Sequence, residues 1–577
     1  MLNSNPTIVL KFGSSVLGDA ADLDAVVAEC YRYRRDGYQV IAVVSAFGET
    51  TDDLFQAALA HTPEPDEEAL AELLATGEIA SASWLTLALR NAGLTARSWM
   101  PGELNFVAEG SRLSGRPVDL EVDTLRSHLE AGEIAVVPGF FAKDREGQTI
   151  LLGRGGSDLS AVFLAKKIGA QRCRLIKDTD GVYESDPNVA DANPRRFAQI
   201  SFADALKLGA EVLQARALEF AEAADYSFEV AALHGEHFTR VGSPLTQLVG
   251  DKIRPAAKLN LLIAGGGVVG SALIKELAKY PDLFEILGVL VRDRHRTRDW
   301  GATPPLAFDQ MEVFLARPAD VVVELLGGED LAPELIDQAR QQGRAVVSAN
   351  KAWFAREEAP VLDFKKIFAS AAVGGALPVL ECLGALSRRG ESPLRIRGLL
   401  NGTSNFILNR LAEGEHFQAT LLVAQERGFA ESDPTRDLDG RDAEDKLKLI
   451  ARLLGKEIVE KVAAVPINEA TAARAIEAAK RGQRIRQVAT LTILDDGATL
   501  EVELQEVGVG DPLYCAPGAL NLVTIECASG LRERLGGLGA GGRPTAESVL
   551  GDLLQIHRDR HSIDCHDKET NCEEITA

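Results

Sequence analysis

The part of this sequence with the clearest chemical potential is a string of carboxylates that ends in a lysine. Between Ala424 and Lys446 it contains Gly428, Phe429, Glu431, Asp433, Pro434, Asp437, Gly440 and Asp442. Charged groups beside an apolar helical segment cost free energy unless they are paired or used. A lysine near a reacting carbonyl can stabilise developing negative charge and supply a proton. The string therefore predicts an active site, and the simpler alternative is a solvated acidic loop leading into a helix.

A glycine pattern supplies a second chemical signal. G-x-G-x-x-G starts at Gly265, between the strand-like run Leu259–Ala264 and the amphipathic helix predicted over Ser271–Tyr280. Such glycines let the backbone approach a pyrophosphate, which then sits at the helix N-terminus. The pattern predicts a dinucleotide cofactor contacting Gly265, Gly267, Val268, Val269 and Gly270. A tight strand–helix turn without a ligand is the alternative.

The next strand bears on which cofactor binds. We expect a strand over Phe284–Val291 that ends beside the adenosine ribose, where NAD-preferring folds usually carry an acidic side chain. The chain places Arg292 there instead, and an arginine can meet a 2′-phosphate. The sequence thus favours NADP over NAD, although NAD stays possible and Arg292 as a solvated strand-end residue is the alternative.

Loops of the first half suggest a phosphate site. Gly153-Arg154-Gly155-Gly156-Ser157-Asp158 joins a predicted strand to a helix, and consecutive backbone N–H groups there can form an anion-binding nest. The segment Asp178–Pro187 follows another strand-like run, and Ser45–Asp52 and Thr76–Glu78 complete the set. A purely structural role for these loops is the alternative.

The composition limits the classes of partner. The length of 577 residues predicts roughly three or four domains, and the formal charge of −23 argues against nucleic acid or an anionic membrane. Phosphate-bearing cofactors stay compatible because they need only local positive groups. Seven cysteines without a C-x-x-C pair, the absence of a signal peptide and the lack of an apolar run of roughly 18 residues predict a cytoplasmic protein.

Alternating strand-like and helical segments position these motifs. Strands are expected at 7–13, 39–45, 134–139 and 174–177 with a helix at 67–92, which predicts a mostly parallel sheet covered on both faces. The alternation resumes at 259 and gives way after about residue 370 to antiparallel strands at 394–400, 487–493 and 499–507. The fold class is therefore α/β. We expect domains at 1–250, 257–370, 371–540 and 541–556, a linker near 253, and a disordered tail at 557–577.

The string A-x3-G-F-A-E-S-D-P-x2-D-L-x-G-x-D-x3-K resembles the homoserine dehydrogenase signature. Further segments extend the resemblance over almost all of residues 257–556, namely Val321–Gly328, Val346–Lys351, Ala371–Pro378, Asn401–Asn405, Gly537–Gly542 and Pro544–Leu550. It implies a Rossmann domain followed by an α+β substrate and dimerisation domain. It also implies NAD(P)H-dependent reduction of aspartate 4-semialdehyde to homoserine, in a homodimer or higher homo-oligomer.

The resemblance assigns roles to individual residues. Lys446 is the acid/base group, Lys351 is a second lysine near substrate and nicotinamide, and Asn350 adjoins the cofactor. Glu431 and Asp442 grip the substrate ammonium, and Asp437 helps to position it. Backbone carbonyls of Val373, Gly375 and Leu377 are expected around a monovalent cation. Ser370 stands where the family usually has a glutamate that helps to bind this ion, so the cation stays uncertain.

Residues 6–248 resemble the amino-acid kinase fold, closest to aspartokinase. This resemblance implies transfer of the ATP γ-phosphoryl group to aspartate with Mg²⁺ on the phosphates. Lys11 would contact the transferring phosphate, and Asp158 would organise the acceptor side. The implied nucleotide-side residues are Gly13, Ser14, Asp178, Asp180 and Tyr183. The implied substrate-side residues are Glu78, Arg154, Ser157 and Thr50 or Thr51.

Several departures bear on the kinase activity. Lys177 replaces the usual threonine, Asn188 replaces an arginine facing ATP, and Glu211 replaces a lysine on the ATP side. Candidates to compensate are Lys177, Arg195, Arg196 and Lys207. Two alternatives stay open: a dehydrogenase whose kinase-like half is an inactive dimerisation module, and a non-catalytic sensor of amino acid and nucleotide. No segment between the halves matches an ACT regulatory region, so we expect no feedback inhibition through one.

Overall fold

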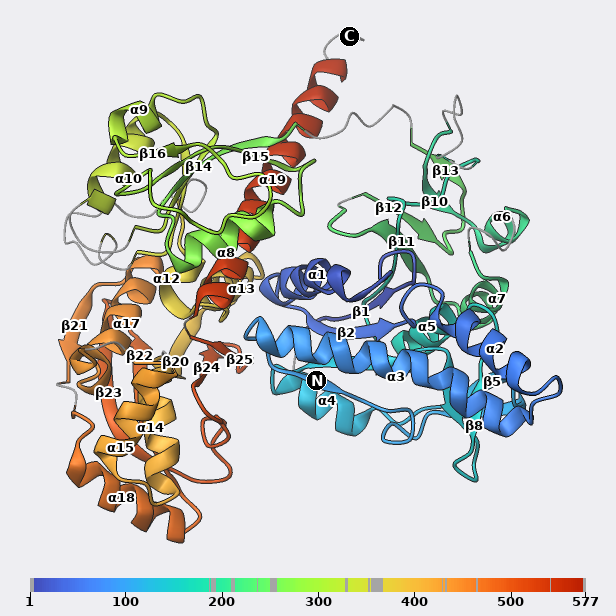
Figure 1. Ribbon diagram of the computed structural model, residues 1–577, viewed down its shortest axis with the longest axis horizontal. Helices are drawn as coiled ribbons and strands as arrows, with labels where there is room; N and C mark the ends of the chain where they lie inside the picture. The colour runs from blue at the N-terminus through green and yellow to red at the C-terminus, as the bar shows by residue number, and fades with distance from the viewer. Residues whose placement is uncertain are drawn as a thin grey trace. The chain divides into compact units, whose positions relative to one another are not determined.

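The computed structural model groups the chain into two compact units. The N-terminal unit comprises mainly Ser4–Asn91 and Thr95–Arg254, and the C-terminal unit comprises mainly Pro255–Ala577. Figure 1 labels the elements of both. The structure describes residues 5–185, 187, 194–208, 213–235, 237–249, 257–326, 331–350, 353, 367–427, 429–430, 433–462, 465–539 and 541–573. The predicted linker therefore lies largely outside the described residues.

A nine-stranded sheet forms the centre of the N-terminal unit. Its strand order is β13-β10-β12-β11-β9-β1-β2-β6-β3, and the pairs from β11 through β9, β1, β2 and β6 to β3 are all parallel. The strands are β1 (Thr7–Phe12), β2 (Gln39–Val44), β3 (Ala96–Ser98), β6 (Ile134–Pro138), β9 (Arg172–Lys177), β10 (Phe197–Ile200), β11 (Phe228–Ala232), β12 (Phe238–Val241) and β13 (Gln247–Leu248). The parallel order brings the carboxyl ends of β1 and β9 together.

Helices cover both faces of this sheet, as the sequence predicts. One face packs against α4 (Asp123–Glu130), α5 (Gly156–Ile168) and α7 (Ala215–Ala223) in a single apolar cluster. On the other lie α1 (Leu23–Arg35) and α3 (Glu67–Asn91), which contact each other and β2. Every residue of β1 and β2 is consequently buried.

Smaller elements complete the N-terminal unit. A four-stranded sheet has the order β5-β4-β7-β8. Its strands are β4 (Val107–Ser111), β5 (Ser114–Asp119), β7 (Phe141–Lys143) and β8 (Thr149–Leu151). The remaining helices are α2 (Thr50–His61), α6 (Phe202–Lys207) and a short 3-10 helix at Ala20–Asp22. Strand β8 leads through the predicted anion-binding loop into α5.

The C-terminal unit begins with a parallel six-stranded sheet. Its order, β16-β15-β14-β17-β18-β19, corresponds to 3-2-1-4-5-6 and is that of a Rossmann domain. The strands are β14 (Leu259–Ala264), β15 (Phe284–Leu290), β16 (Ala307–Phe308), β17 (Val321–Glu324), β18 (Ala345–Ser348) and β19 (Ile367–Phe368). Helices α8 (Val268–Leu277), α9 (Met311–Leu315) and α10 (Leu331–Gln341) accompany them. The α/β class expected from the sequence is confirmed.

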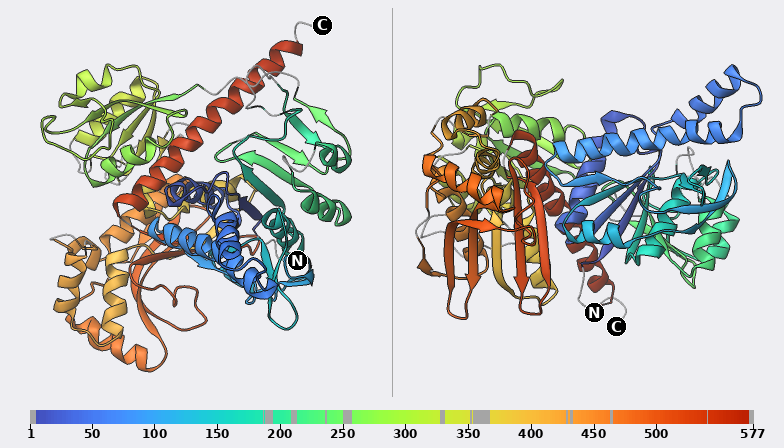
Figure 2. Two further views of the ribbon diagram at one scale, coloured as in Figure 1. Left: turned by 45° about the vertical axis from the view of Figure 1, so that its right-hand side comes forward. Right: turned by 90° about the horizontal axis from the view of Figure 1, so that it is seen from below.

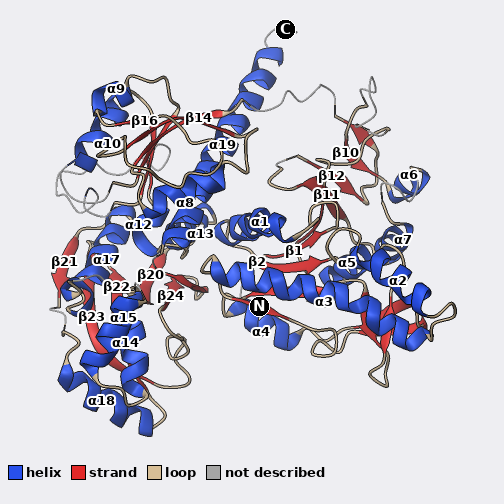
Figure 3. Cartoon of the chain, in the orientation of Figure 1, coloured by secondary structure: helices blue, strands red, loops and turns tan. Residues whose placement is uncertain are grey.

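An antiparallel sheet with its own helices follows. The strand order is β21-β23-β22-β20-β24-β25, built from β20 (Pro393–Leu399), β21 (Ile458–Lys461), β22 (Arg484–Ile493), β23 (Ala498–Val507), β24 (Leu520–Cys527) and β25 (Arg532–Leu538). Figure 3 shows α14 (Gly402–Ala412), α15 (Phe417–Glu426) and α18 (Glu469–Lys480) lying together beside this sheet. The other helices are α12 (Ser370–Gly374), α13 (Val379–Arg388), α16 (Thr435–Leu438) and α17 (Arg441–Leu453).

The long helix α19 returns to the Rossmann domain. It runs over Gly542–Glu573 and packs against α8 (Figure 2). The helix continues past residue 557, where we expected disorder. His557 is buried beside Phe284, and Arg560 pairs with Asp320 at 2.8 Å, so tertiary contacts extend it. Within the described residues, no helix has both the length and the apolar character that crossing a membrane requires.

Candidate active sites

A buried carboxylate between two lysines forms the centre of the N-terminal site. Lys11 Nζ lies 2.6 Å from one oxygen of Asp158, and Lys177 Nζ lies 3.2 Å from the other. Lys11 is on β1, Lys177 ends β9, and Asp158 lies in the first turn of α5. The neighbouring strands fix the two lysines because Lys11 pairs in register with Leu175, two residues before Lys177.

The electrostatics favour this charged arrangement. Burial alone would raise the pKa of Asp158, but the ammonium groups of Lys11 and Lys177 outweigh it and lower the pKa to about 2. Burial lowers the pKa of Lys11, and Asp158 opposes that shift. Asp158 is therefore ionised at neutral pH, and it offsets part of the cost of burying Lys11.

Glu78 lies near this cluster in a different state. It belongs to α3, is almost fully buried, and accepts a hydrogen bond from the Ala46 backbone N–H at 3.2 Å. Burial raises its pKa to about 7, with Lys11 and the backbone acting against the shift. A Cβ at Gly77 would lie 2.9 Å from the Cβ of Ala46 and 3.6 Å from Thr50. Gly77, which precedes Glu78, thus packs closely against Ala46 and Thr50.

The glycine-rich loops leave backbone close to the lysines. A Cβ at Gly13 would lie 3.0 Å from Lys11 Nζ, and Ser14 beside it is exposed. Gly153 and Gly155 both have a φ of +73°, which favours glycine, and Gly155 is the N-cap of α5. Arg154 is exposed, whereas Ser157 is buried against Gly139. Gly153, Gly155 and Ser157 thus lie at the start of α5, and phosphate binding by this loop stays a prediction.

The loop after β9 has its own polar contacts. The Tyr183 hydroxyl donates to Asp180 at 2.5 Å, and Arg196 Nε lies 3.7 Å from Asp180, whereas Asp178 is exposed. Of the proposed compensating cations, Arg195 pairs with Glu184 and Lys207 with Asp204, both at exposed positions. Only Lys177 reaches Asp158 among the four, within the described residues. Asn188 and Glu211 lie outside those residues.

In the C-terminal unit, an asparagine joins the predicted carboxylates. The Asn401 amide nitrogen donates to Asp437 at 2.7 Å and to Asp442 at 2.9 Å, while its oxygen caps α14 by accepting from the Ser404 N–H. Lys446, one turn after Asp442 on α17, lies 2.8 Å from the Asp442 carboxylate and donates to the Leu400 carbonyl at 2.5 Å. Lys446 is almost fully buried.

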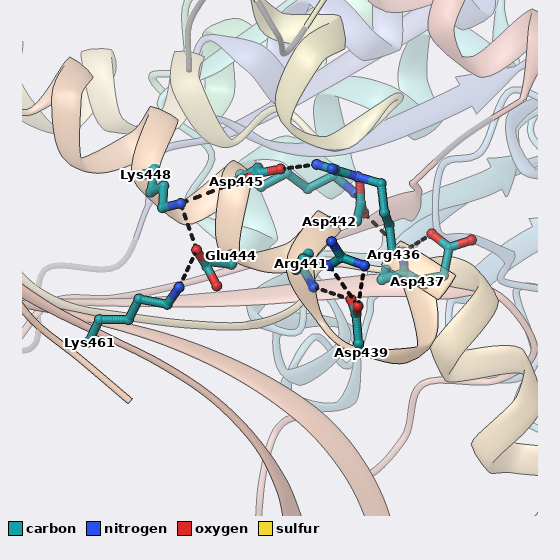
Figure 4. A network of polar contacts seen from close by, with 11 residues as sticks. Arg436, Asp437, Asp439, Arg441, Asp442, Glu444, Asp445, Lys448 and Lys461 are labelled. Carbon is teal, nitrogen blue, oxygen red and sulfur yellow. Dashed lines mark hydrogen bonds and ion pairs between the residues drawn. The ribbon is translucent and has the colours of Figure 1, made fainter. Parts of the chain in front are cut away.

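An outer layer of ion pairs holds α17 in place (Figure 4). Glu444 lies 2.6 Å from Lys448 and 2.8 Å from Lys461 of β21. Burial would raise the pKa of Glu444, but these two lysines lower it. Arg436 of α16 also pairs with Asp445. These ion pairs lie on the outer side of α17, whereas Asp442 and Lys446 contact Asn401 and the Leu400 carbonyl.

The glycine turn of the Rossmann domain fits a dinucleotide. Gly265 has a φ of +115°, and a Cβ at Gly270 would lie 1.9 Å from the Gly265 carbonyl, so both glycines are required by the turn. A Cβ at Gly267, in contrast, would meet nothing within 4 Å. Gly267 is the N-cap of α8 without a side-chain cap, and the following Val268 is exposed. The backbone N–H groups at this helix N-terminus are open to an anion.

Polar residues at the ends of the strands beside this turn are joined by hydrogen bonds. Glu324, fully buried at the end of β17, accepts from the Ser348 hydroxyl at 2.6 Å, and Ser348 accepts from the Asn350 N–H at 3.1 Å. Arg292 follows β15 and is exposed. Lys351 and Glu431, two of the predicted site residues, lie outside the described residues.

Comparison with protein families identifies the domains in which the two candidate sites lie. The amino acid kinase family matches residues 6–230, the NAD-binding domain of homoserine dehydrogenase matches 265–376, and the homoserine dehydrogenase family matches 378–554. The chain joins an amino acid kinase domain to the two domains of a homoserine dehydrogenase. These families act in amino-acid biosynthesis on small molecules, which agrees with the acidic composition.

Individual relatives cover only parts of the chain. An aspartokinase of Thermus thermophilus is 34% identical over 218 residues, 37% of this chain and 54% of that protein. Aspartokinase 2 of Bacillus subtilis is 34% identical over 226 residues, 39% of this chain and 55% of that protein. The chain thus spans about half the length of the curated relatives that it matches. A solved homoserine dehydrogenase from Thiobacillus denitrificans is 27% identical over 53% of this chain and 74% of that one, with a TM-score of 0.49.

Ser370 of the homoserine dehydrogenase part has a buried partner. Its hydroxyl donates to Asp552 of α19 at 2.6 Å. Val373 and Leu377 are buried near the same turn, Gly375 has a φ of +59°, and the Leu377 carbonyl accepts from the Val379 N–H at 2.8 Å. Cation binding by these carbonyls stays a prediction.

Sequence reasoning missed three positioning contacts. It gave no role to Asn401, although an asparagine that follows a strand and opens a helix is a recognisable N-cap signal. It did not foresee that Lys177 would share Asp158 with Lys11. The Ser370–Asp552 contact has no local signal at all, because its partners are 182 residues apart.

Proposed function

We propose that the chain is an enzyme with two active sites. In this proposal the C-terminal unit reduces aspartate 4-semialdehyde to homoserine with NADPH, and the N-terminal unit phosphorylates the side-chain carboxylate of aspartate. The observation that carries the first activity is the buried Lys446 bound to Asp442, with Asp437 held beside them by Asn401. The Lys11–Asp158–Lys177 cluster supports the second.

The dehydrogenase step needs a hydride and a proton. The bound nicotinamide cofactor supplies the hydride to the aldehyde carbon. Lys446 donates a proton to the carbonyl oxygen as negative charge develops on it, so the product is an alcohol. Asp442 keeps the Lys446 ammonium oriented, and the carboxylates of Asp437 and Asp442 attract the substrate ammonium. Glu431 and Lys351 join them in the assignment that the family resemblance implies.

The NADPH preference rests on Arg292. Its guanidinium is exposed just after β15, where a bidentate contact with a 2′-phosphate is possible. Gly267 and the uncapped start of α8 receive the pyrophosphate. Replacing Arg292 by aspartate should raise the Kd for NADPH more than for NADH. Cofactor fluorescence in the absence of substrate measures both constants, and an unchanged ratio would remove Arg292 from the cofactor site.

The kinase step is a direct phosphoryl transfer. A carboxylate oxygen of aspartate attacks the γ-phosphorus, the bond to the β,γ-bridging oxygen breaks, and ADP leaves with that electron pair. Lys11 stabilises the charge on the transferring group, and Mg²⁺ accompanies the ATP phosphates. Glu78 receives the substrate ammonium, and Arg154 the substrate carboxylate. Asp178, Asp180 and Tyr183 form the nucleotide side.

A second candidate keeps only the dehydrogenase active. Asn188 and Glu211 replace basic residues of the aspartokinase pattern, and this favours a structural role for the N-terminal unit. A hydroxylamine-trapping assay with ATP, Mg²⁺ and aspartate separates the candidates: the proposal expects aspartyl hydroxamate from the full chain and none from Lys11→Ala. A homo-oligomer also stays a prediction, which a measurement of the molar mass in solution tests.

A further inference from the structure

Lys177 occupies an unusual position in the kinase site. It replaces a threonine of the aspartokinase pattern, yet its ammonium group binds the same buried carboxylate as Lys11. Asp158 is ionised, as its pKa of about 2 indicates. Two lysine side chains therefore share one carboxylate, and with both lysines protonated this cluster of three groups carries a surplus positive charge.

Among the described residues, Glu78 also acts on Lys11 but balances this surplus charge only in part. Glu78 acts on Lys11, but its pKa of about 7 leaves much of it protonated at neutral pH. A buried excess of positive charge is costly unless an anion joins it. Binding of an anionic ligand would therefore lower the electrostatic cost of this site.

Exposure and position indicate where that anion binds. The Lys177 side chain is 21% exposed, against 7% for Lys11 and 2% for Asp158. Lys177 is the last residue of β9 and pairs in register with Ala232 at the end of parallel β11. Ligands of open parallel sheets bind outside these carboxyl ends of the strands. Of the three groups, Lys177 is the most exposed, and it lies at this edge of the sheet.

We propose that Lys177 contacts the transferring phosphoryl group of ATP together with Lys11, and that it replaces the basic partners absent at Asn188 and Glu211. This inference rests on the proposed kinase function. Asp158 holds the two ammonium groups apart and oriented before the nucleotide binds. When the γ-phosphoryl group arrives, its charge balances the surplus, and Lys177 stabilises the negative charge that spreads over its oxygens during transfer.

Variants of Lys177 can separate this role from a purely structural ion pair. Lys177→Met removes the charge and keeps most of the length, and Lys177→Arg restores a cation. Lys167→Met is the matched control, because Lys167 pairs with Asp119 at 2.7 Å on the exposed side of the same unit. Two quantities are measured on the full chain: hydroxamate formation, and the Kd values of Mg²⁺ complexes of adenylyl imidodiphosphate and ADP by calorimetry.

The proposal expects that Lys177→Met weakens contacts with the γ-phosphoryl group more than contacts with the rest of the nucleotide. Lys177→Met should lower kcat by about 100-fold and weaken the imidodiphosphate analogue more than ADP, with partial recovery in Lys177→Arg and no change in Lys167→Met. Equal weakening of both nucleotides, or a lower melting temperature with normal kinetics, would overturn the inference and leave the kinase function intact.

The kinase function and the lysine contact can also fail separately. Wild-type protein that forms no hydroxamate but binds the analogue in a Lys177-dependent way would contradict the kinase function and support the phosphate contact. Wild-type protein that binds neither nucleotide would overturn both.

Discussion

The two sites of this chain are built from the same kinds of group in opposite proportion. In the N-terminal unit, Lys11 and Lys177 share Asp158, so cations exceed anions among these three described groups. In the C-terminal unit, Lys446 lies with Asp437 and Asp442 linked through Asn401, so the described carboxylates exceed the lysine. The first arrangement suits a polyphosphate, and the second suits a substrate that carries an ammonium group. The sign of the surplus charge therefore separates the triphosphate of the proposed kinase from the amino-acid substrate of the proposed dehydrogenase.

The sites also differ in how they are held together. Asp442 and Lys446 are one turn apart on a single helix, and the Asn401 amide and the Leu400 carbonyl also contact them. Lys11, Lys177 and Asp158 come from two strands and a helix, so their geometry exists only in the assembled sheet. We expect the dehydrogenase site to tolerate changes in distant packing better than the kinase site.

The largest expected effect is the loss of Lys446. Lys446→Ala removes the proton donor and should lower homoserine dehydrogenase kcat by about 10²–10⁴-fold, without changing hydroxamate formation. Lys448→Ala is the control, because Lys448 lies on the outer side of α17 and pairs with Glu444. NADPH absorbance follows the reaction. Comparable losses in the two variants would show that charge on the helix, and not proton donation, is what matters.

Asp158→Asn should have the next largest effect, confined to the kinase. The two lysines lose their counter-charge and their fixed orientation, so kcat for hydroxamate formation should fall by roughly 10²–10³-fold. Asp119→Asn removes an exposed partner of Lys167 and serves as the control. If Asp158→Asn kept wild-type kinetics, the surplus-charge comparison between the sites would lose its basis.

The sequence predicted the elements better than it predicted the contacts. The periodicity located β1, α3, β14 and the antiparallel β20, β22 and β23 to within a few residues, because local alternation encodes them. Asp442 and Lys446 were named as site residues only through the family resemblance, and the structure places them one turn apart on α17.

The missed contacts join residues that are far apart in the chain. Asn401 bridges to Asp437 and Asp442 across separations of 36 and 41 residues. Lys177 lies 19 residues after Asp158, and both meet Lys11 because β9 lies next to β1 in the sheet. Such partners depend on the order of strands, which local patterns do not specify.

Asn401 gives a smaller, specific test of the carboxylate pair. Asn401→Ala should reduce dehydrogenase kcat/KM by roughly 10- to 100-fold, because misplaced reacting groups lose rate steeply. It also removes a helix cap, at about 1 kcal/mol of stability. Asn468→Ala matches that second effect, since Asn468 caps α18 by accepting from the Ala470 N–H. Equal loss of activity in both variants would show that Asn401 acts only as a helix cap.

The smallest expected effect is a pH dependence that involves Glu78. Its pKa is raised from 4.5 to about 7, so kcat/KM for aspartate should increase several-fold as pH rises through 7 and Glu78 ionises. The folded carboxyl holds its proton to higher pH than the unfolded one. The contribution of Glu78 to the free energy of unfolding therefore falls as pH rises from about 4.5 to 7. Glu78→Gln should flatten both profiles.

Stability alone is a weaker readout for this prediction. Glu547 in the C-terminal unit also has a pKa raised to about 7, by burial and by Glu276, and adds a slope of the same sign. The difference between the stability profiles of wild type and Glu78→Gln isolates the contribution of Glu78. A kinase profile that is unchanged in the variant would place Glu78 outside the aspartate site.

The most direct test of two separate active sites in one chain is a crossed assay of the full-length protein. Hydroxamate formation from aspartate and homoserine oxidation are measured for wild type, Lys11→Ala and Lys446→Ala. We predict that wild type performs both reactions, that Lys11→Ala loses only the first, and that Lys446→Ala loses only the second. Normal homoserine oxidation with no hydroxamate from wild type would contradict the account and leave the N-terminal unit as a structural domain.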